Sequence, residues 1–244
     1  MRGDKNMARI VKNPDVRRNE ILDVAQQFFY QKGYAQTSVQ DVITEIGIAK
    51  GTFYHYFSSK LDLLDAVVER MIEQTLQSME PLVADERLSA LEKFERFFND
   101  IANWKIENKD FFIELMNIWY KDENAILRHK AKTASIEKTV PLLGQIIAQG
   151  VVEGIFATQY PADIAEIVLH IGHSLSDALV KIILNEAHND DTLAIIIRKT
   201  TVYHCAIERT LNAPAGSIKL FNMDQVKPWL TGGVSEYAGE IVAA

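Results

Sequence analysis

The sequence of 244 residues contains a single cysteine, Cys205. One thiol can neither close a disulfide within the chain nor begin a cysteine-based zinc motif, so we expect Cys205 to serve as a small apolar residue in a reducing compartment. Proline and glycine are also scarce, with 6 and 12 residues. Because alternation of apolar and polar residues, as in strands, is rare and helix-breaking residues are few, the sequence favours an all-α fold.

Long hydrophobic runs are missing as well. No apolar stretch approaches the roughly 18 residues that a membrane span requires. The polar start of the chain has no apolar segment behind it, which argues against a signal peptide. We therefore expect a cytoplasmic protein with no membrane partner. Hydrophobic residues make up 48% of the sequence, which is typical of a folded globular protein and not of a disordered one.

Positive charge is in the minority, with 26 Lys and Arg against 33 Asp and Glu and a net charge of -7. Such a total argues against nucleic acid, because phosphates repel an acidic surface. The charge is unevenly distributed, however. Residues 1–60 contain 9 basic and 6 acidic residues, whereas the remainder contains 17 and 27. A nucleic-acid interface near the amino terminus is therefore compatible with the acidic total.

Apolar periodicity and turn residues divide the chain into four predicted parts. Residues 1–15 form a flexible basic arm, 16–68 a set of short helices, 69–212 a group of long amphipathic helices, and 213–244 a tail. The long helices are predicted near 86–105, 110–120, 123–149, 162–187 and 190–211. Pro141 is expected to kink or split the third of these. We expect part of the tail to dock through Phe221, Val226, Trp229 and Leu230.

Residues 16–68 describe a helix-turn-helix unit, in which a tight glycine-containing turn joins the second and third of three short helices. The third helix, predicted over Thr52–Phe57, is short enough to enter a major groove with its amino-terminal end facing base edges. Gly33 and Gly47 are placed to end the first two helices, and Thr37 or Ser38 to cap the second. The predicted core residues are Phe28, Phe29, Val42, Ile46, Phe53 and Phe57.

At this point the sequence resembles the tetracycline-repressor-type (TetR) family of transcriptional regulators. The resemblance covers residues 16–68, and its most specific part is the run Gly51-Thr52-Phe53-Tyr54-His55-Tyr56-Phe57-Ser58-Ser59-Lys60. Two departures are visible: Ile46 stands where the family usually has alanine, and Ala49 stands where serine or threonine often caps the third helix. Since alanine is a weak cap, costing about 1 kcal/mol, we hypothesise that this helix orders fully only on DNA.

The resemblance implies a helix-turn-helix domain followed by a larger helical domain that binds an effector and forms a homodimer, with no cofactor and no enzymatic activity. It assigns residues to double-stranded operator DNA in two groups. Phosphate contacts fall to Ser38, Thr52, Tyr54, Lys60 and Arg17, and base-facing positions to Gln40, Lys50, Gly51, His55 and Tyr56. The alternative is that Tyr54 and Tyr56 are half-buried aromatics. Further cations for the flanking DNA are Arg18, Lys5, Arg9 and Lys12.

The larger domain offers an aromatic group and two apolar stripes. The candidates for an effector pocket are Trp104, Phe111, Phe112, Met116, Trp119 and Tyr120, which suit an aromatic or lipophilic compound. The candidates for the dimer helices are Ile164, Ile167, Ile171, Leu175, Leu179, Leu193, Ile196, Tyr203 and Ile207. The alternative for both groups is ordinary packing within one chain, which periodicity alone does not distinguish.

His170, His173 and Asp177 share one helical face at a spacing compatible with a metal, but we see no ligand from a second element and predict no metal site. The favoured function is a repressor that an effector releases from a pseudo-palindromic operator. A ligand-independent DNA-binding dimer or adaptor is the alternative. A helical metal-dependent hydrolase is a remote third.

Overall fold

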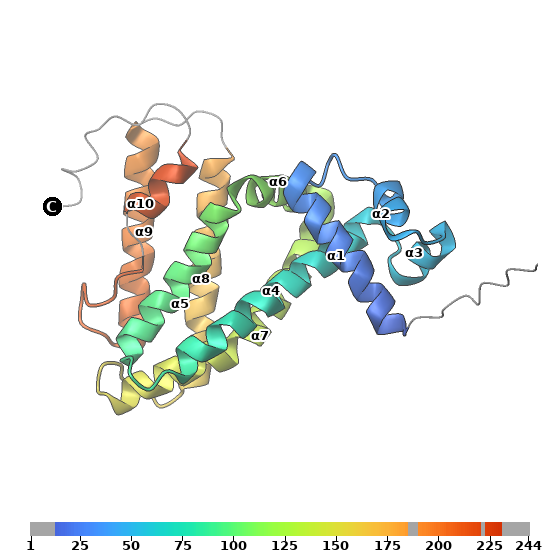
Figure 1. Ribbon diagram of the computed structural model, residues 1–244. Coiled ribbons are helices and arrows are strands. Elements are labelled where there is room, and N and C mark those ends of the chain that lie inside the picture. The colour runs from blue at the N-terminus through green and yellow to red at the C-terminus, as the bar shows by residue number, and fades with distance from the viewer. Residues whose placement is uncertain (1–12, 185–189, 221–222, 231–244) are drawn as a thin grey trace, which may run out of the picture. The chain divides into compact units, whose positions relative to one another are not determined.

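The computed structural model describes residues 13–184, 190–220 and 223–230, and Figure 1 shows a chain built from helices. No strand occurs within these ranges, so the all-α prediction is confirmed. The chain divides into two compact units, with the boundary between Arg70 and Met71. None of the helices in the described ranges is both long and apolar enough to cross a membrane. Several residues with predicted roles lie outside these ranges: Lys5, Arg9, Lys12 and Phe221.

The first unit contains α1 (Pro14–Lys32), α2 (Val39–Ile46), α3 (Lys50–Tyr56) and the start of α4 (Lys60–Ala84). The Asn13 side chain caps α1 by accepting a hydrogen bond from the Asp15 backbone at 3.0 Å. The buried apolar residues of this unit include Ile21, Leu22, Ala25, Phe29, Val42, Ile43, Phe53, Phe57, Leu63 and Leu64. Of the six predicted core residues, Phe28 and Ile46 are only partly buried. This small core holds α2 and α3, of 8 and 7 residues, which are too short to be stable alone.

The turn between α2 and α3 is set by caps at both ends of α2. Ser38 and Asp41 form a capping box, in which each side chain accepts a hydrogen bond from the other residue's backbone at about 3 Å. At the other end, Gly47 adopts φ 71° and ψ 37°, the left-handed conformation that glycine enters without steric cost. The chain therefore reverses within three residues and α3 begins at Lys50.

The second unit takes the rest of α4 and then α5 (Ala90–Glu107), α6 (Lys109–Trp119), α7 (Ala125–Val152), α8 (Pro161–Ile183) and α9 (Asp190–Leu211). A 3-10 turn, η1 (Asp122–Asn124), precedes α7. Two predictions need correction. The helix predicted from residue 86 begins at Ala90, because Ser89 and Glu92 form a capping box there. The split predicted at Pro141 does not occur, because Pro141 and Glu137 are exposed and water can satisfy the carbonyl that the proline ring leaves unpaired.

The main core of the second unit joins α5, α7, α8 and α9 through buried residues that include Phe94, Phe97, Leu143, Ile146, Ile147, Phe156, Val168 and Leu211. Lys93 is buried within it, and its ammonium donates to the Val83 carbonyl and to Gln149 Oε1, both at 2.7 Å. After α7 the chain turns back so that Phe156 lies on Gly150. A Cβ at Gly150 would come within 2.2 Å of the Phe156 ring, so this position requires glycine.

The last described segment, α10 (Met223–Val226) and η2 (Lys227–Trp229), packs on the second unit. Leu230 and Val226 join a small apolar cluster with Leu193 and Ile196 of α9. These two residues were among those expected to dock the tail. The Gln225 amide donates to Asn99 and Asn103 of α5 at 3.0 and 3.1 Å. Lys109 donates to the Pro228 carbonyl at 2.5 Å, and the Trp229 ring meets the Phe112 ring edge-on at 5.6 Å.

Candidate functional site

The surface of α3 carries most of the predicted DNA-facing residues. Lys50, Gly51, Tyr54 and His55 are exposed, with 47% of the Tyr54 surface accessible. The opposite face buries Phe53 and Phe57, whose ring centroids lie 5.8 Å apart. Because the buried rings fix the rotation of α3, the polar residues of its amino-terminal turn point into solvent. A helix presented in this way fits the major groove of B-DNA.

Residues on α2 and at the helix ends extend this surface. Ser38 and Gln40 are exposed, and the Gln40 amide donates to Thr44 Oγ1 at 3.1 Å. Thr52 and Tyr56 are partly buried, so the half-buried alternative describes Tyr56 better than Tyr54. We call the set Ser38, Gln40, Lys50, Gly51, Thr52, Tyr54, His55, Tyr56 and Lys60 the α2–α3 surface.

Lys60 is the first residue of α4, where free backbone N–H groups favour an anion. Its ammonium lies 4.0 Å from the centre of the Tyr34 ring and donates to the Ala35 carbonyl at 3.4 Å. A weak cation–π contact and one long hydrogen bond hold the charge without neutralising it. These contacts place the ammonium beside the first turn of α4.

Two arginines expected to approach flanking DNA have internal contacts. Arg17 donates to Glu20 at 2.7 Å, and its side chain is 19% exposed. The Arg18 guanidinium lies 5.4 Å from the centre of the Phe57 ring. A phosphate would have to compete with Glu20 for Arg17, which makes this arginine the weakest member of the predicted phosphate group.

Gly51 has a conformational freedom that the fold itself does not use. A Cβ built at this position meets no atom within 4 Å, and its φ is not positive. Within a helix, glycine is less favourable than alanine by about 1 kcal/mol. Since the chain gains nothing from glycine here, the missing side chain is consistent with close approach of another molecule.

Two carboxylates of the first unit have shifted pKa values. Hydrogen bonds from Lys32 and Ser38 hold the pKa of Asp41 at about 2, so the cap of α2 stays charged at neutral pH. Burial, together with the charges of Asp62 and Glu69, raises the pKa of Asp65 to about 6. One carboxylate oxygen of Asp65 is buried and has no hydrogen-bond partner among the described residues.

The aromatic residues expected to line an effector pocket lie on α5, α6 and the turn after α6. Phe111 and Met116 are buried, and Trp104, Phe112, Trp119 and Tyr120 are partly exposed. Phe112 contacts both the carboxyl-terminal segment and α5: the Trp229 ring lies 5.6 Å away and the Lys105 ammonium 5.3 Å. The Arg128 guanidinium stacks on Tyr120 at 4.7 Å.

A group of polar side chains lies beside these aromatics, and we call Lys105, Tyr120, Arg128, Lys132, His173 and Asp177 the polar cluster. The Tyr120 hydroxyl donates to Asp177 Oδ1 at 2.6 Å, and Lys132 donates to Asp177 Oδ2 at 3.1 Å. Burial opposes the charge of Asp177, but these two hydrogen bonds keep its pKa below the usual range. Burial, and then the Asp177 carboxylate, raises the pKa of Tyr120.

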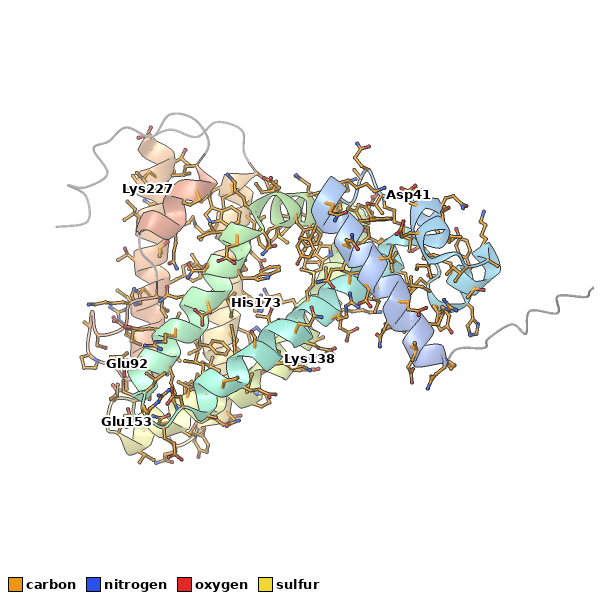
Figure 2. All side chains as sticks on the ribbon, viewed as in Figure 1. Asp41, Glu92, Lys138, Glu153, His173 and Lys227 are labelled. Carbon is orange, nitrogen blue, oxygen red and sulfur yellow. The ribbon has the colours of Figure 1, made fainter. Side chains whose placement is uncertain are left out.

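His173, labelled in Figure 2, lies on α8. Burial, together with the charges of Lys105 and Lys132, lowers its pKa to about 4, so the imidazole is neutral at neutral pH. Helical spacing grouped His173 and Asp177 only with His170. The latter is largely exposed and lies 3.7 Å from Glu166. No three His, Cys, Asp or Glu side chains in the described ranges are grouped to hold a metal ion.

Lys105 and Lys132 were missed by sequence reasoning. They lie on different helices, α5 and α7, and periodicity within one helix carries no information about a meeting between two. The only signal was local: Lys105 interrupts an apolar face just after Trp104, one turn beyond Ile101.

The predicted dimer residues fall into two groups. Leu175, Leu193, Ile196 and Ile207 are at most 3% exposed and pack inside this chain, so a partner could not reach them; for these four the alternative of internal packing holds. Ile164, Ile171, Leu179 and Tyr203 are partly buried. Ile167 is 46% exposed on α8, and α9 exposes Ile195 and Val202, at 39% and 61%.

Comparisons with known proteins place both units in one family. A family model described as bacterial regulatory proteins of the tetR family matches residues 21–67, and a tetracyclin repressor-like carboxyl-terminal domain matches residues 118–187. The chain is 28% identical over 146 residues to the transcriptional regulator EthR of Mycolicibacterium smegmatis, covering 53% of this chain and 67% of that protein.

One further relative supports the same placement, and one solved structure shares the fold. The transcriptional repressor KstR2 of Mycobacterium tuberculosis is 25% identical over 163 residues, which cover 65% of this chain and 78% of KstR2. The crystal structure of RolR in complex with resorcinol shares the fold, with a TM-score of 0.60 and 15% identity over 90% of this chain and 95% of that one. The chain therefore belongs to the TetR family of bacterial transcriptional regulators, and its helix-turn-helix is the DNA-binding part.

Proposed function

We propose that this regulator is a repressor that binds a pseudo-palindromic operator as a homodimer and leaves it when the second unit takes up a small effector. The observation that carries the DNA-binding half of this proposal is the α2–α3 surface, where buried Phe53 and Phe57 hold exposed Lys50, Gly51, Tyr54 and His55 outward. KstR2, a relative, is named a repressor, and repression is proposed here on that similarity.

The proposed contacts follow from side-chain chemistry. Hydroxyl and ammonium groups of Ser38, Thr52, Tyr54 and Lys60 donate to phosphate oxygens and so position the protein without reading sequence. Gln40 suits adenine and Lys50 suits guanine in the major groove. The remaining base-facing positions are Gly51, His55 and Tyr56, and Arg17 is a peripheral phosphate contact. The proposed DNA-binding domain is residues 16–68, with residues 1–15 as an arm along flanking DNA.

The proposed effector and dimer functions belong to residues 69–212. RolR was solved with resorcinol, and an aromatic or lipophilic effector suits the side chains of Trp104, Phe112, Trp119 and Tyr120. The exposed apolar residues Ile167, Ile195 and Val202 of α8 and α9 are the proposed dimer contacts. A cytoplasmic location follows from the function, because the operator lies there.

The decisive experiment is an unbiased selection of duplex DNA by the full-length protein, followed by a binding assay on the selected site. We expect two inverted half-sites about one helical turn apart. Compounds that raise the melting temperature of the protein should then weaken operator binding. A selected site without symmetry would overturn the dimeric reading. A bound compound that leaves operator affinity unchanged would favour the ligand-independent DNA-binding dimer instead.

A further inference from the structure

Lys105 lies in the second unit with its ammonium 5.3 Å from the centre of the Phe112 ring. Part of its side chain remains accessible, yet burial lowers the pKa of the ammonium, and burial is the whole cause of the shift. Within the described ranges no hydrogen bond or ion pair satisfies this group. Its one close contact is the face of an aromatic ring, which is a weak substitute for a carboxylate.

The surrounding charges do not compensate Lys105. Asp177 is the carboxylate of the polar cluster, and it already accepts hydrogen bonds from Tyr120 and Lys132. Arg128 adds a further positive charge beside Tyr120. The polar cluster therefore carries more positive than negative charge, inside a part of the chain whose total charge is strongly acidic. The excess of positive charge is therefore a property of the polar cluster, whereas the second unit as a whole is negative.

A partly buried ammonium without a carboxylate partner is poorly solvated, and a bound anion would stabilise it through a charge-assisted hydrogen bond. A second donor, on α6, also lacks a partner. The indole N–H of Trp119 is buried and has no acceptor among the residues that the structure describes. The aromatic faces of Phe112 and Trp104 would meet the apolar body of the same ligand.

We propose that the effector is a lipophilic organic anion whose acidic group binds the Lys105 ammonium and whose apolar body lies against Phe112. This inference rests on the proposed function, because it names the chemical class of the effector that the second unit binds. It makes Lys105 the residue that selects charge, while the aromatic residues select size and apolar character.

A matched pair of fluorescent probes tests the charge requirement. 1-Anilinonaphthalene-8-sulfonate is an anion, and N-phenyl-1-naphthylamine has the same rings without the sulfonate. Both are titrated into the full-length protein without DNA, at physiological salt. The variants are Lys105→Met, which removes the charge at similar length, and Lys105→Arg, which keeps it. Lys130→Met, on an exposed position of α7, is the control for surface binding of the anion.

The wild-type protein and Lys130→Met should bind the sulfonate more tightly than the neutral probe. Lys105→Met should lose about 10- to 100-fold in affinity for the sulfonate, which is the effect of one charge-assisted hydrogen bond, and should keep its affinity for the neutral probe. Lys105→Arg should retain the preference. Equal binding of the two probes by the wild type, or an unchanged preference in Lys105→Met, would overturn the proposal.

Stability without ligand separates binding from a structural role. Lys105→Met should melt at the same or a higher temperature than the wild type, because it removes a partly buried charge that has no carboxylate partner. A lower melting temperature would make Lys105 a structural residue and overturn its assignment. Because no DNA is present, failure of operator release leaves this result intact. Conversely, operator release by both probes, with equal sulfonate midpoints in the wild type and Lys105→Met, would support the proposed function and overturn the anion.

Discussion

The ammonium of Lys60 lies 4.0 Å above the ring of Tyr34, at the first residue of α4. The ring comes from the turn after α1, so the charge is held where this turn meets the start of α4. Lysine side chains on a surface usually sample many rotamers, and such a side chain loses conformational entropy when it binds a phosphate in one of them. Here the aromatic ring has already restricted the lysine, which lowers the entropy lost on binding.

Lys60→Ala should therefore weaken binding to every DNA sequence by a similar factor. Loss of one phosphate contact should reduce the slope of log affinity against log salt by about one unit. Operator titrations at several salt concentrations measure both effects, with Lys130→Ala as the control. A change in base preference, with the salt slope unaltered, would show that Lys60 does not contact phosphate.

Gly51→Ala should separate folding from DNA binding. The added methyl group meets no atom of the chain within 4 Å, and alanine favours a helix by about 1 kcal/mol over glycine. The variant should melt at a higher temperature yet bind its operator more weakly, because the Cβ intrudes on the groove. Thermal melting and operator titration are the two measurements. Unchanged operator affinity would remove Gly51 from the DNA surface.

Ala49→Ser supplies the cap that α3 lacks. The Ala49 side chain makes no capping hydrogen bond, whereas Ser38 and Ser89 cap the following helices. A serine should stabilise α3 by about 1 kcal/mol and slow amide hydrogen exchange in Thr52–Tyr56 of the free protein. If the wild-type amides of α3 exchange equally slowly with and without operator, the hypothesis that DNA completes this helix is wrong.

Asp65→Asn should stabilise the protein in a pH-dependent way. The folded pKa of Asp65, about 6, lies above its ordinary value of 3.8, so the folded state binds the proton more tightly. This carboxylate therefore reduces stability as pH rises from about 4 to about 6. The variant should melt above the wild type at pH 7.5 and lose that advantage near pH 4. Glu45→Gln, exposed on α2, should show no such trend.

Val202→Arg should convert the proposed homodimer to a monomer. Val202 is 61% exposed on α9, and a buried arginine without a partner would be costly in an isologous interface, where it occurs twice. Light scattering after gel filtration gives the mass directly. Val152→Arg, at the 88% exposed end of α7, is the matched control and should leave the mass unchanged. A dimer that survives Val202→Arg must use another surface.

Local signals made the first unit predictable. Ser38 and Gly47 mark the ends of α2 with side-chain and backbone chemistry that acts within four residues, and the motif around Lys60 set the family. The second unit was predicted in outline only. α4 continues past Arg70 to Ala84 because its apolar face persists beyond the residues that the motif covers.

Contacts between residues far apart in the sequence could not be predicted from apolar periodicity. Leu175 and Ile167 belong to the same apolar stripe of α8, but one is 2% and the other 46% exposed. Which of them faces the interior depends on where α7 and α9 pack, and that is decided by residues far away in the chain. Asp177 meets Tyr120 across 57 residues and Lys132 across 45, so its partners could not be read from its own helix.

The attachment of the carboxyl-terminal segment also bears on synthesis. Lys109 binds the carbonyl of Pro228, 119 residues later. The residues of the first unit leave the ribosome early, and domains generally fold as units from the amino terminus. α5 and α6 instead gain their contacts with Gln225 and Trp229 only after these late residues have been synthesised. During translation, the protein therefore completes the part that binds DNA well before the part that we propose senses the effector.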